Sequence, residues 1–274
     1  MSCPIGVFDS GYGGLTILKD IVSEMPEYDY IYLGDNARTP YGTRSFDVVY
    51  TYTREAVLKL FSMGCKLVIL ACNTASAKAL RTIQQVDLPQ IDPQRRVLGV
   101  IRPSVEAVAD FTTNGHIGIL ATSGTVASES YLLEIAKIHS GKRFQVTQQA
   151  CPMWVPIVEN NEINSQGAAF FVQKYIDTIM QIDPRIDTLV LACTHYPLLR
   201  NLIDRFIPKG VSVIQQGEIV AQSLKNYLYR HPEMERELSR GGHIEFLTTE
   251  KGGMFDQMAA RFMQSEVISK HVEL

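Results

Sequence analysis

Val68-Ile69-Leu70-Ala71-Cys72-Asn73-Thr74 and Leu189-Val190-Leu191-Ala192-Cys193-Thr194-His195 are two copies of one pattern, 121 residues apart. In each copy an apolar run typical of a buried parallel strand stops at Ala-Cys, and small polar residues lead into a helical pattern. Each sulfur is therefore expected at the carboxyl end of a strand, where open α/β sheets bind ligands. Two thiols at equivalent strand ends predict a proton-transfer site that acts from two sides.

Apolar strand candidates alternate with helical segments along the chain, which predicts a parallel α/β architecture. Strands are expected at 5–8, 30–33, 67–71, 96–100, 117–120, 145–150, 188–192, 212–214 and 243–248, and helices at 15–25, 44–63, 76–85, 104–112, 128–139, 166–181, 198–206 and 218–230. Segments 5–11 and 117–124 form a second matched pair, each a strand that runs into a Ser/Thr-Gly turn. If the two halves face each other, the cysteines approach one ligand from opposite sides of a pseudo-twofold axis.

Composition excludes several classes of protein. The 274 residues are 46% hydrophobic, enough for a sizeable core, and the formal charge of −3 argues against a nucleic-acid partner. The sequence has neither a signal-peptide pattern nor an apolar stretch of roughly 18 residues, so a cytoplasmic protein with no membrane partner is expected. Five cysteines without CxxC spacing favour free thiols over disulfides or a metal site.

The chemistry of a thiol suits proton transfer near neutral pH. Its reference pKa is about 8.5, and a helix N-terminus or a protonated histidine favours the thiolate. One thiolate can remove the proton from Cα of an amino acid while an opposed thiol donates to the other face, which inverts the configuration. Cys3, Cys65 and Cys151 lack the polar neighbours of the matched pair and are expected to be buried structural residues.

Two polar turns follow the first two strands. Asp9 and Ser10 either cap the next helix or, in the case of Asp9, hold a proton for a neighbouring thiol. The loop 34–45 contains Pro40-Tyr41-Gly42, which is an ordinary turn or a place where backbone amides bind a carboxylate. Arg38 and Arg44 either pair with an anionic substrate or are solvated or structural salt-bridging residues.

The second half carries comparable groups. Thr122 and Thr125, like Asn73 and Thr74, supply hydroxyl and amide groups at strand-to-helix turns and are ordinary caps when taken singly. His195 stands in the matched motif, which favours a proton-managing role. The segment 151–162 is expected to be a packed loop, and spacing alone leaves open whether Glu159 or Glu162 assists Cys193.

Several ordered motifs together resemble the bacterial glutamate racemases. They are Gly-Val-Phe-Asp-Ser-Gly (6–11), Gly-Asp-Asn-Ala-Arg-Thr-Pro-Tyr-Gly (34–42), Ala-Cys-Asn-Thr-Ala (71–75) and Ala-Cys-Thr-His-Tyr-Pro-Leu (192–198), and the likeness covers roughly 5–220. The resemblance implies interconversion of L- and D-glutamate by a two-base mechanism without a cofactor, supplying D-glutamate for peptidoglycan, cell-wall biogenesis and cell shape. It also implies two pseudosymmetric parallel-sheet α/β domains, 1–101 with 214–274 and 102–213, with the active site in the cleft between them.

The resemblance assigns a role to individual residues. Cys72 would deprotonate D-glutamate with help from Asp9, and Cys193 would deprotonate L-glutamate with help from His195 and Glu159. The expected substrate-binding residues are Asp9, Ser10, Tyr41, Gly42, Asn73, Thr74, Thr122, Thr125, Thr194 and His195. No metal is implied, and family analogy favours a homo-oligomer, with a dimer as the first choice.

Three alternatives stay open at this point. A racemase for another acidic amino acid would use the same proton chemistry with a pocket of different length, and Pro40-Tyr41-Gly42 favours glutamate only by resemblance. A noncatalytic amino-acid sensor would leave both thiols without a purpose. A cysteine hydrolase built on Cys193 and His195 would leave Cys72 unexplained.

Overall fold

The computed structural model describes residues 3–141, 143–251 and 253–274. The chain divides into two compact units, Met1–Val100 with Gly217–Leu274, and Ile101–Gln216. The limits expected from the sequence fall one residue after the first observed boundary and three residues before the second. Ile214 pairs with Val190 in the second sheet, so it belongs to the second unit rather than the first.

The first unit is built on a six-stranded parallel sheet in the order β10-β9-β2-β1-β3-β4. Its strands are β1 (Ile5–Asp9), β2 (Tyr30–Gly34), β3 (Leu67–Leu70), β4 (Arg96–Gly99), β9 (Ile244–Thr248) and β10 (Ser269–His271). The three central strands β2, β1 and β3 are buried along their whole length, as expected for a sheet with helices on both faces. Their carboxyl ends therefore come together at one edge of the sheet.

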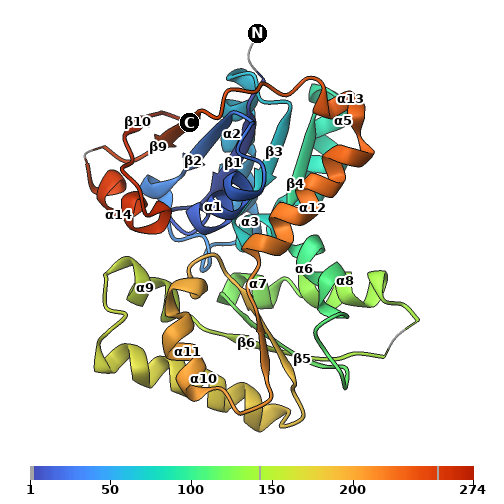
Figure 1. Cartoon of the computed structure of the whole chain (residues 1–274), viewed down its shortest axis with the longest axis vertical. Coiled ribbons are helices and arrows are strands. Elements are labelled where there is room, and N and C mark those ends of the chain that lie inside the picture. Colours follow the sequence, from blue (N-terminus) through green and yellow to red (C-terminus); the bar gives the residue numbers. More distant parts are fainter. Residues whose placement is uncertain (1–2, 142, 252) are drawn as a thin grey trace. The chain divides into compact units, whose positions relative to one another are not determined.

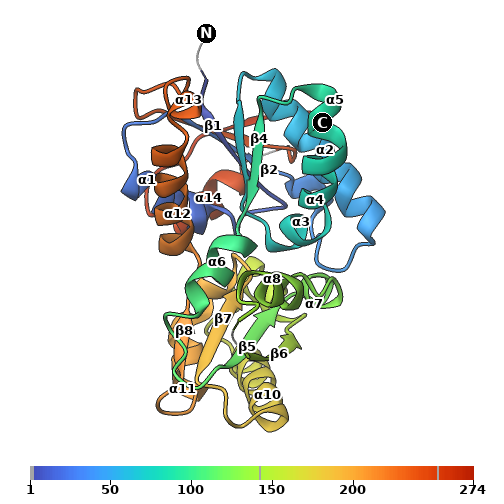
Figure 2. The same cartoon turned by 90° about the vertical axis from the view of Figure 1, so that its right-hand side faces the viewer.

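Helices cover both faces of this sheet (Figures 1 and 2). One layer contains α1 (Leu15–Glu24), α12 (Gly217–Arg230) and α14 (Met254–Met263), with α1 packed against the other two. The opposite layer contains α2 (Phe46–Ser62), α3 (Asn73–Lys78), α4 (Leu80–Thr82), η2 (Ile83–Asp87) and α5 (Leu88–Ile91). The short helices η1 (Asn36–Arg38) and α13 (Pro232–Glu235) complete the unit.

The second unit has a four-stranded parallel sheet in the order β6-β5-β7-β8. Its strands are β5 (His116–Ala121), β6 (Gln145–Ala150), β7 (Thr188–Ala192) and β8 (Ser212–Ile214). Its helices are α6 (Ile101–Val108), α7 (Ser123–Ala127), α8 (Ser130–Ile138), α9 (Trp154–Glu159), α10 (Gln166–Ile182), η3 (Tyr196–Leu199) and α11 (Arg200–Phe206). Central β5 and β7 pair from Ile117–Thr188 to Ala121–Ala192, so the turns that follow them lie at the same edge.

Several elements differ from the sequence-based expectation. The segment expected as a packed loop contains α9, in which Trp154, Ile157 and Val158 at helical spacing are buried, and Pro156 lies in the first turn, where no backbone N–H is needed. The helix expected at 76–85 begins instead at Asn73 and continues as a series of short segments to Ile91. After the expected strand at 243–248, the structure adds α14 and β10 to the first unit, although no element was expected beyond residue 248.

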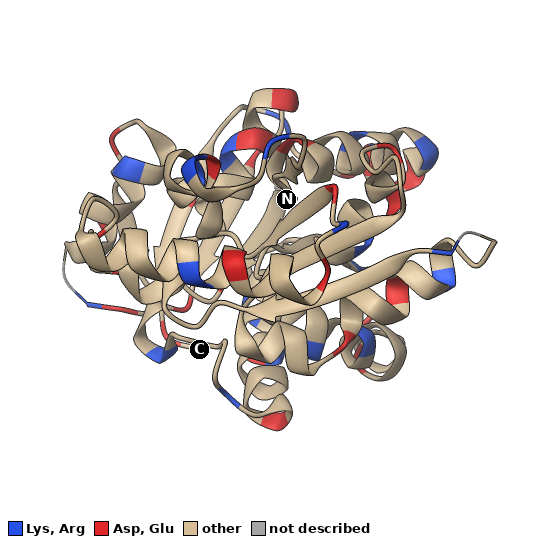
Figure 3. Cartoon of the chain, turned by 90° about the horizontal axis from the view of Figure 1, so that it is seen from below, with Lys and Arg blue, Asp and Glu red and all other residues tan. Residues whose placement is uncertain are grey.

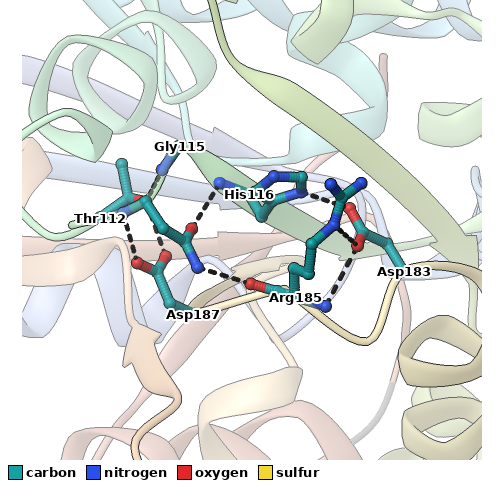
Figure 4. Close-up of polar contacts among 7 residues, drawn as sticks. Thr112, Gly115, His116, Asp183, Arg185 and Asp187 are labelled. Carbon is teal, nitrogen blue, oxygen red and sulfur yellow. Dashed lines mark hydrogen bonds and ion pairs between the residues drawn. The ribbon is translucent and has the colours of Figure 1, made fainter.

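A polar network closes the amino-terminal edge of the second sheet (Figure 4). Asp187 accepts hydrogen bonds from the Thr112 hydroxyl at 2.6 Å, from the Thr113 amide at 2.7 Å and from the Asn114 amide at 2.9 Å. Beside it, His116 Nδ1 and Asp183 Oδ2 are 2.6 Å apart. Burial opposes the charge on Asp187, but these hydrogen bonds outweigh it and lower the pKa of the carboxyl to about 2. The network holds the loop before β5 against the loop before β7.

The outer helices carry both signs of charge, with Lys and Arg interspersed among Asp and Glu in the view of Figure 3. Within the three described ranges, no helix combines the length and apolar character needed to cross a membrane. The same ranges contain no group of three or more His, Cys, Asp or Glu side chains placed to hold a metal ion.

Candidate active site

Cys72 lies where β3 ends and α3 begins, as the copied motif predicts. It is the N-cap residue of α3, and its Sγ accepts a hydrogen bond from the Ala75 amide at 3.4 Å. The Ser10 hydroxyl lies 3.4 Å from the same sulfur. A thiolate at this position is stabilised by backbone amide and hydroxyl groups, because both can donate to a negative sulfur.

Asp9 ends the neighbouring strand at the same edge of the sheet. The Ala71 amide donates to the Phe8 carbonyl at 2.8 Å, which aligns the ends of β1 and β3. Asp9 is only 1% exposed, and its Oδ1 accepts a hydrogen bond from the Gly11 amide at 2.9 Å. The structure therefore brings Asp9, Ser10 and Cys72 together at one end of the first sheet.

The loop after β2 is held by a buried carboxylate. Asp35 is 0% exposed; its Oδ2 accepts the Tyr41 hydroxyl and pairs with Arg38 Nε at 2.7 Å. Arg38 also pairs with Glu55. Burial opposes the charge on Arg38, but Glu55 and Asp35 outweigh it and raise the pKa of the guanidinium. Of the two roles open for Arg38, the structure favours the salt bridge.

Asp35 also fixes the Tyr41 side chain. Burial, and then the negative charge and hydrogen bond of Asp35, raise the pKa of the Tyr41 phenol above its ordinary value, so the ring stays neutral. The Tyr41 ring is buried against Phe8 and Tyr52. The other arginine of the loop, Arg44, is exposed, and its carbonyl accepts a hydrogen bond from Lys78.

Asn73 and Thr74 are the first two residues of α3, directly after Cys72, and both are buried. Gly42, after the Tyr41 anchor, is half-buried. Every residue that the sequence assigns to the amino-terminal half of the site thus belongs to the first unit and lies at or just beyond the carboxyl ends of its central strands.

The second unit places Cys193 at the end of β7, next to a histidine and a carboxylate. Cys193 Sγ and His195 Nδ1 are 3.9 Å apart, and His195 Nε2 lies 3.1 Å from Glu159 Oε1. Cys193 and His195 are both buried. Glu159 is the last residue of α9, whereas Glu162 is exposed beyond the helix. Of the two glutamates left open by spacing, the structure brings Glu159 to His195.

The charge on His195 follows from these neighbours. Burial alone would lower its pKa, but hydrogen bonds to Cys193 and Glu159 outweigh burial and raise the pKa to about 10. The imidazole is therefore protonated at neutral pH and can donate toward the sulfur through Nδ1 and toward Glu159 through Nε2. An imidazolium beside a cysteine can supply a proton to a thiolate or stabilise its charge.

Three threonines stand near the same edge of the second sheet. Thr122 is the N-cap residue of α7, and its Oγ1 lies 3.1 Å from the Thr125 hydroxyl and accepts the Thr125 amide at 3.3 Å. Thr194 lies between Cys193 and His195 and is buried. The paired hydroxyls follow β5, and Thr194 follows β7, so both groups lie at the end of the sheet that holds Cys193.

The other three cysteines are buried, as expected. Burial raises the pKa of Cys3, and it raises the pKa of Cys65 to about 12. Burial also raises the pKa of Cys151, with a contribution from the charge of nearby Cys193. These thiols are held in the protonated form at neutral pH.

Sequence patterns missed three residues that contact the predicted site residues or the loop that carries them, namely Asp35, Gly14 and Thr249. Asp35 lies within the 34–42 motif, and Thr249 lies far away from it along the chain. The sequence shows Gly14 as one glycine of a flexible turn; the structure shows that a Cβ there would lie 2.5 Å from Asp9 Cβ. The one signal in the sequence was an acidic residue between an apolar strand and Pro-Tyr-Gly, because a carboxylate that becomes buried there requires partners.

Comparison with known proteins identifies the family. Residues 7–224 match the model of the Asp/Glu/hydantoin racemase family. A glutamate racemase of Ruegeria sp. is 37% identical over 273 residues, covering 96% of this chain and 97% of the relative. The crystal structure of a Bacillus anthracis glutamate racemase isoform superposes with a TM-score of 0.89 at 32% identity, covering 99% of this chain and 98% of that one. A Francisella tularensis glutamate racemase in complex with D-glutamate gives a TM-score of 0.87 at 29% identity, with coverage of 99% and 98%. The chain therefore belongs to the glutamate racemases of the Asp/Glu/hydantoin racemase family.

Proposed function

We propose that the protein interconverts L- and D-glutamate by two-base proton transfer between Cα and the thiols of Cys72 and Cys193. The observation that carries the proposal is that each cysteine stands at the carboxyl end of a central strand beside its own acid–base group. Asp9 and Ser10 accompany Cys72, and His195 with Glu159 accompanies Cys193. Within the part of the chain that the structure describes, the other three buried cysteines have no such set of partners.

In the D-to-L direction the Cys72 thiolate takes the proton from Cα and becomes a thiol. The electron pair left on Cα then takes a proton from the Cys193 thiol on the opposite face, so Cys193 becomes a thiolate. The L-to-D direction exchanges the two roles. No electron is gained or lost, and each turnover moves the proton deficit from one sulfur to the other, which the assisting groups must reset.

The assisting groups differ between the two sulfurs. After D-to-L turnover, we assign Asp9 to accepting a proton from the Cys72 thiol and the His195 imidazolium to donating one to the Cys193 thiolate; the L-to-D direction reverses both transfers. Glu159 holds the imidazolium in its charged form and fixes its orientation, because Glu159 Oε1 lies 3.1 Å from His195 Nε2. This chemistry uses side chains alone and needs no cofactor.

Backbone amides and small polar side chains are assigned to substrate binding. The Tyr41 and Gly42 amides, in a loop anchored through Asp35, suit the carboxylate distant from Cα and so set the chain length of the substrate. Ser10, Asn73, Thr74, Thr122, Thr125, Thr194 and His195 hold the ammonium and the other carboxylate. The Francisella relative was crystallised with D-glutamate, which supports the same ligand here.

The biological role proposed is supply of D-glutamate for peptidoglycan, in the cytoplasm. A homodimer remains a prediction, which light scattering of the purified protein can check.

The deciding experiment is proton exchange at Cα. Purified, reduced protein is given D-glutamate in heavy water without added cofactor, and deuterium incorporation is followed by NMR together with loss of optical rotation. Both signals should appear with wild type and fall by several orders of magnitude in Cys72→Ser and Cys193→Ser, because an alcohol is far less acidic than a thiol. Retained turnover in either variant overturns the two-thiol mechanism.

Two further outcomes point elsewhere. Faster turnover of aspartate than of glutamate would reassign the substrate. Binding of glutamate, measured by calorimetry, without any exchange would identify a sensor.

A further inference from the structure

Thr249 lies beyond the part of the chain matched by the family model, which ends at residue 224, yet it contacts the loop that carries Tyr41 and Gly42. It is the residue directly after β9, and β9 pairs with β2 in the first sheet. Figure 1 shows these two strands side by side although they come from opposite ends of the sequence. The carboxyl-terminal segment therefore reaches the edge of the sheet where the first half of the site lies.

Three hydrogen bonds join Thr249 to the start of the loop. Its hydroxyl donates to Asp35 Oδ1 at 2.8 Å and accepts the Ala37 amide at 3.0 Å. Its own amide donates to the Gly34 carbonyl at 3.1 Å. A single hydroxyl thus satisfies a buried carboxylate and a backbone amide at the same time.

Asp35 in turn contacts both the loop and the end of β1. Its other oxygen, Oδ2, accepts the Tyr41 hydroxyl, and its amide donates to the Asp9 carbonyl at 3.0 Å. The Asp35 carboxylate is fully buried, so losing one of its donors leaves a desolvated oxygen without compensation. The orientation of this carboxylate fixes the Tyr41 ring and, through it, the Tyr41-Gly42 backbone.

We propose that Thr249 is a positioning residue for substrate binding, acting through Asp35 on the Tyr41-Gly42 amides. The inference rests on the proposed function of that loop as the site of the distal carboxylate. That carboxylate keeps its charge while the proton moves at Cα, so contacts to it stabilise the bound substrate and the transition state equally. Disturbing the loop therefore raises KM and leaves kcat nearly unchanged.

The test compares Thr249→Val, which replaces the hydroxyl by a methyl group of similar size, with Thr249→Ser, which keeps the hydroxyl. Racemisation is followed by circular dichroism in both directions. Thr249→Val is expected to raise KM for both enantiomers about tenfold, the factor that corresponds to loss of one hydrogen bond to a charged group. Thr249→Ser is expected to stay within about twofold of wild type.

Thr53→Val is the matched control. Thr53 is fully buried in α2 of the same unit, and its hydroxyl has no hydrogen-bond partner among the residues that the structure describes. The same chemical change there removes no interaction with the loop, so KM should not change. Thermal melts of all variants report any general loss of stability. Such a loss would not by itself raise KM while leaving kcat unchanged.

A double-mutant cycle tests the route through Asp35. Tyr41→Phe removes the other hydroxyl that donates to this carboxylate, while the Tyr41 backbone amide remains. If both hydroxyls act by orienting Asp35, the increase in KM of the double variant is smaller than the product of the two single increases. Independent effects that multiply would overturn the proposed route.

The remaining outcomes separate this inference from the proposed function. An active wild type combined with an unchanged KM in Thr249→Val refutes the positioning role alone. A fall in kcat with KM unchanged also refutes it, because it would place the effect on the chemical step. A folded wild type that fails to exchange Cα protons refutes the proposed function, whatever Thr249 does.

Discussion

Substituting Gly14 by alanine tests how closely Asp9 must be placed. Gly14 precedes α1 and has φ −60° and ψ −15°, a conformation that alanine adopts without strain. A Cβ at this position would lie 2.5 Å from Asp9 Cβ, 2.9 Å from Asp9 Cγ and 3.1 Å from Ala71 Cβ. The substitution therefore acts by steric contact alone.

The required movement can be worked out from these distances. Ordinary contact begins at 3.4 Å, so Asp9 and the start of α1 must separate by about 0.9 Å. A change of side-chain rotamer cannot relieve the clash, because Asp9 Cβ is fixed by the backbone. Asp9 pairs with Gly34 in β2, and Phe8 pairs with Leu70 in β3, so the strand is held on both sides. Misplacing a group that takes part in proton transfer by about 1 Å costs roughly 100-fold in rate.

We therefore expect Gly14→Ala to lower kcat about 100-fold, or about 2.7 kcal/mol in the activation barrier, and to lower the free energy of unfolding by about 1–3 kcal/mol. Initial rates are measured by circular dichroism with each enantiomer, and stability by urea unfolding. Gly167→Ala is the matched control, because the nearest atom to its added Cβ is 3.6 Å away. A folded Gly14→Ala enzyme with wild-type kcat would refute the argument that Asp9 must lie close to its present place.

Glu159→Gln should lower the pKa of His195 from about 10, because it removes a negative partner; the pH at which L-glutamate turnover is lost should then shift downward, as a pH–rate profile would reveal. Since the folded pKa of His195 lies above its unfolded value of about 6.5, its contribution to stability is complete below about pH 6.5 and is lost as the pH rises toward 10. Asp187→Asn should cost about 1–2 kcal/mol of stability at pH 7, discounted for solvent screening, with kcat unchanged. Because burial and hydrogen bonding leave the folded pKa of Asp187 at about 2, below the unfolded value, this cost should shrink as the pH falls from 4 toward 2, and a cost that is constant with pH in urea titrations would contradict the assignment. Gly217→Ala should destabilise the first unit by about 1–3 kcal/mol, because its Cβ would lie 1.6 Å from Asp20 Oδ2, and the loss should be much smaller in an Asp20→Ala background; equal losses in both backgrounds would count against this clash.

The central strands and the two cysteines could be predicted from the sequence because burial on both faces imposes an uninterrupted apolar run. β1, β2, β3, β5 and β7 are such strands, and each coincides with its expected segment to within one residue at each end. The recurrence of Leu-Ala-Cys at two strand ends was enough to place both thiols at sheet edges. Such local patterns can be recognised in a single sequence, because each consists of consecutive residues.

The elements that escaped prediction depend on contacts between distant segments. β10 is only Ser269–His271, exposed or half-buried, and it becomes a strand only because it pairs with β9. α14 is recognisable through the burial of Phe255 and Phe262, whose rings lie against Tyr12 near the other end of the chain. Likewise, Thr249 gains its significance from Asp35, more than two hundred residues away along the chain. The spacing of apolar residues along the chain does not indicate that Thr249 and Asp35 are in contact.

The duplicated motif gives the two sulfurs equivalent places in their sheets but different electrostatic surroundings. Cys72 has a serine hydroxyl and a backbone amide as hydrogen-bond partners, both neutral, whereas Cys193 faces an imidazolium whose pKa is about 10. In a racemase the equilibrium constant between enantiomers is one, so kcat/KM must be equal for L- and D-glutamate at every pH. The asymmetry can therefore appear only in kcat and KM taken separately. Loss of the His195 proton near pH 10 should lower kcat for the two enantiomers by different factors. The ratio of their two KM values should then change by the same factor as the ratio of their two kcat values. Two enantiomers with identical kcat profiles up to pH 10 would mean that the charge on His195 does not distinguish the two steps.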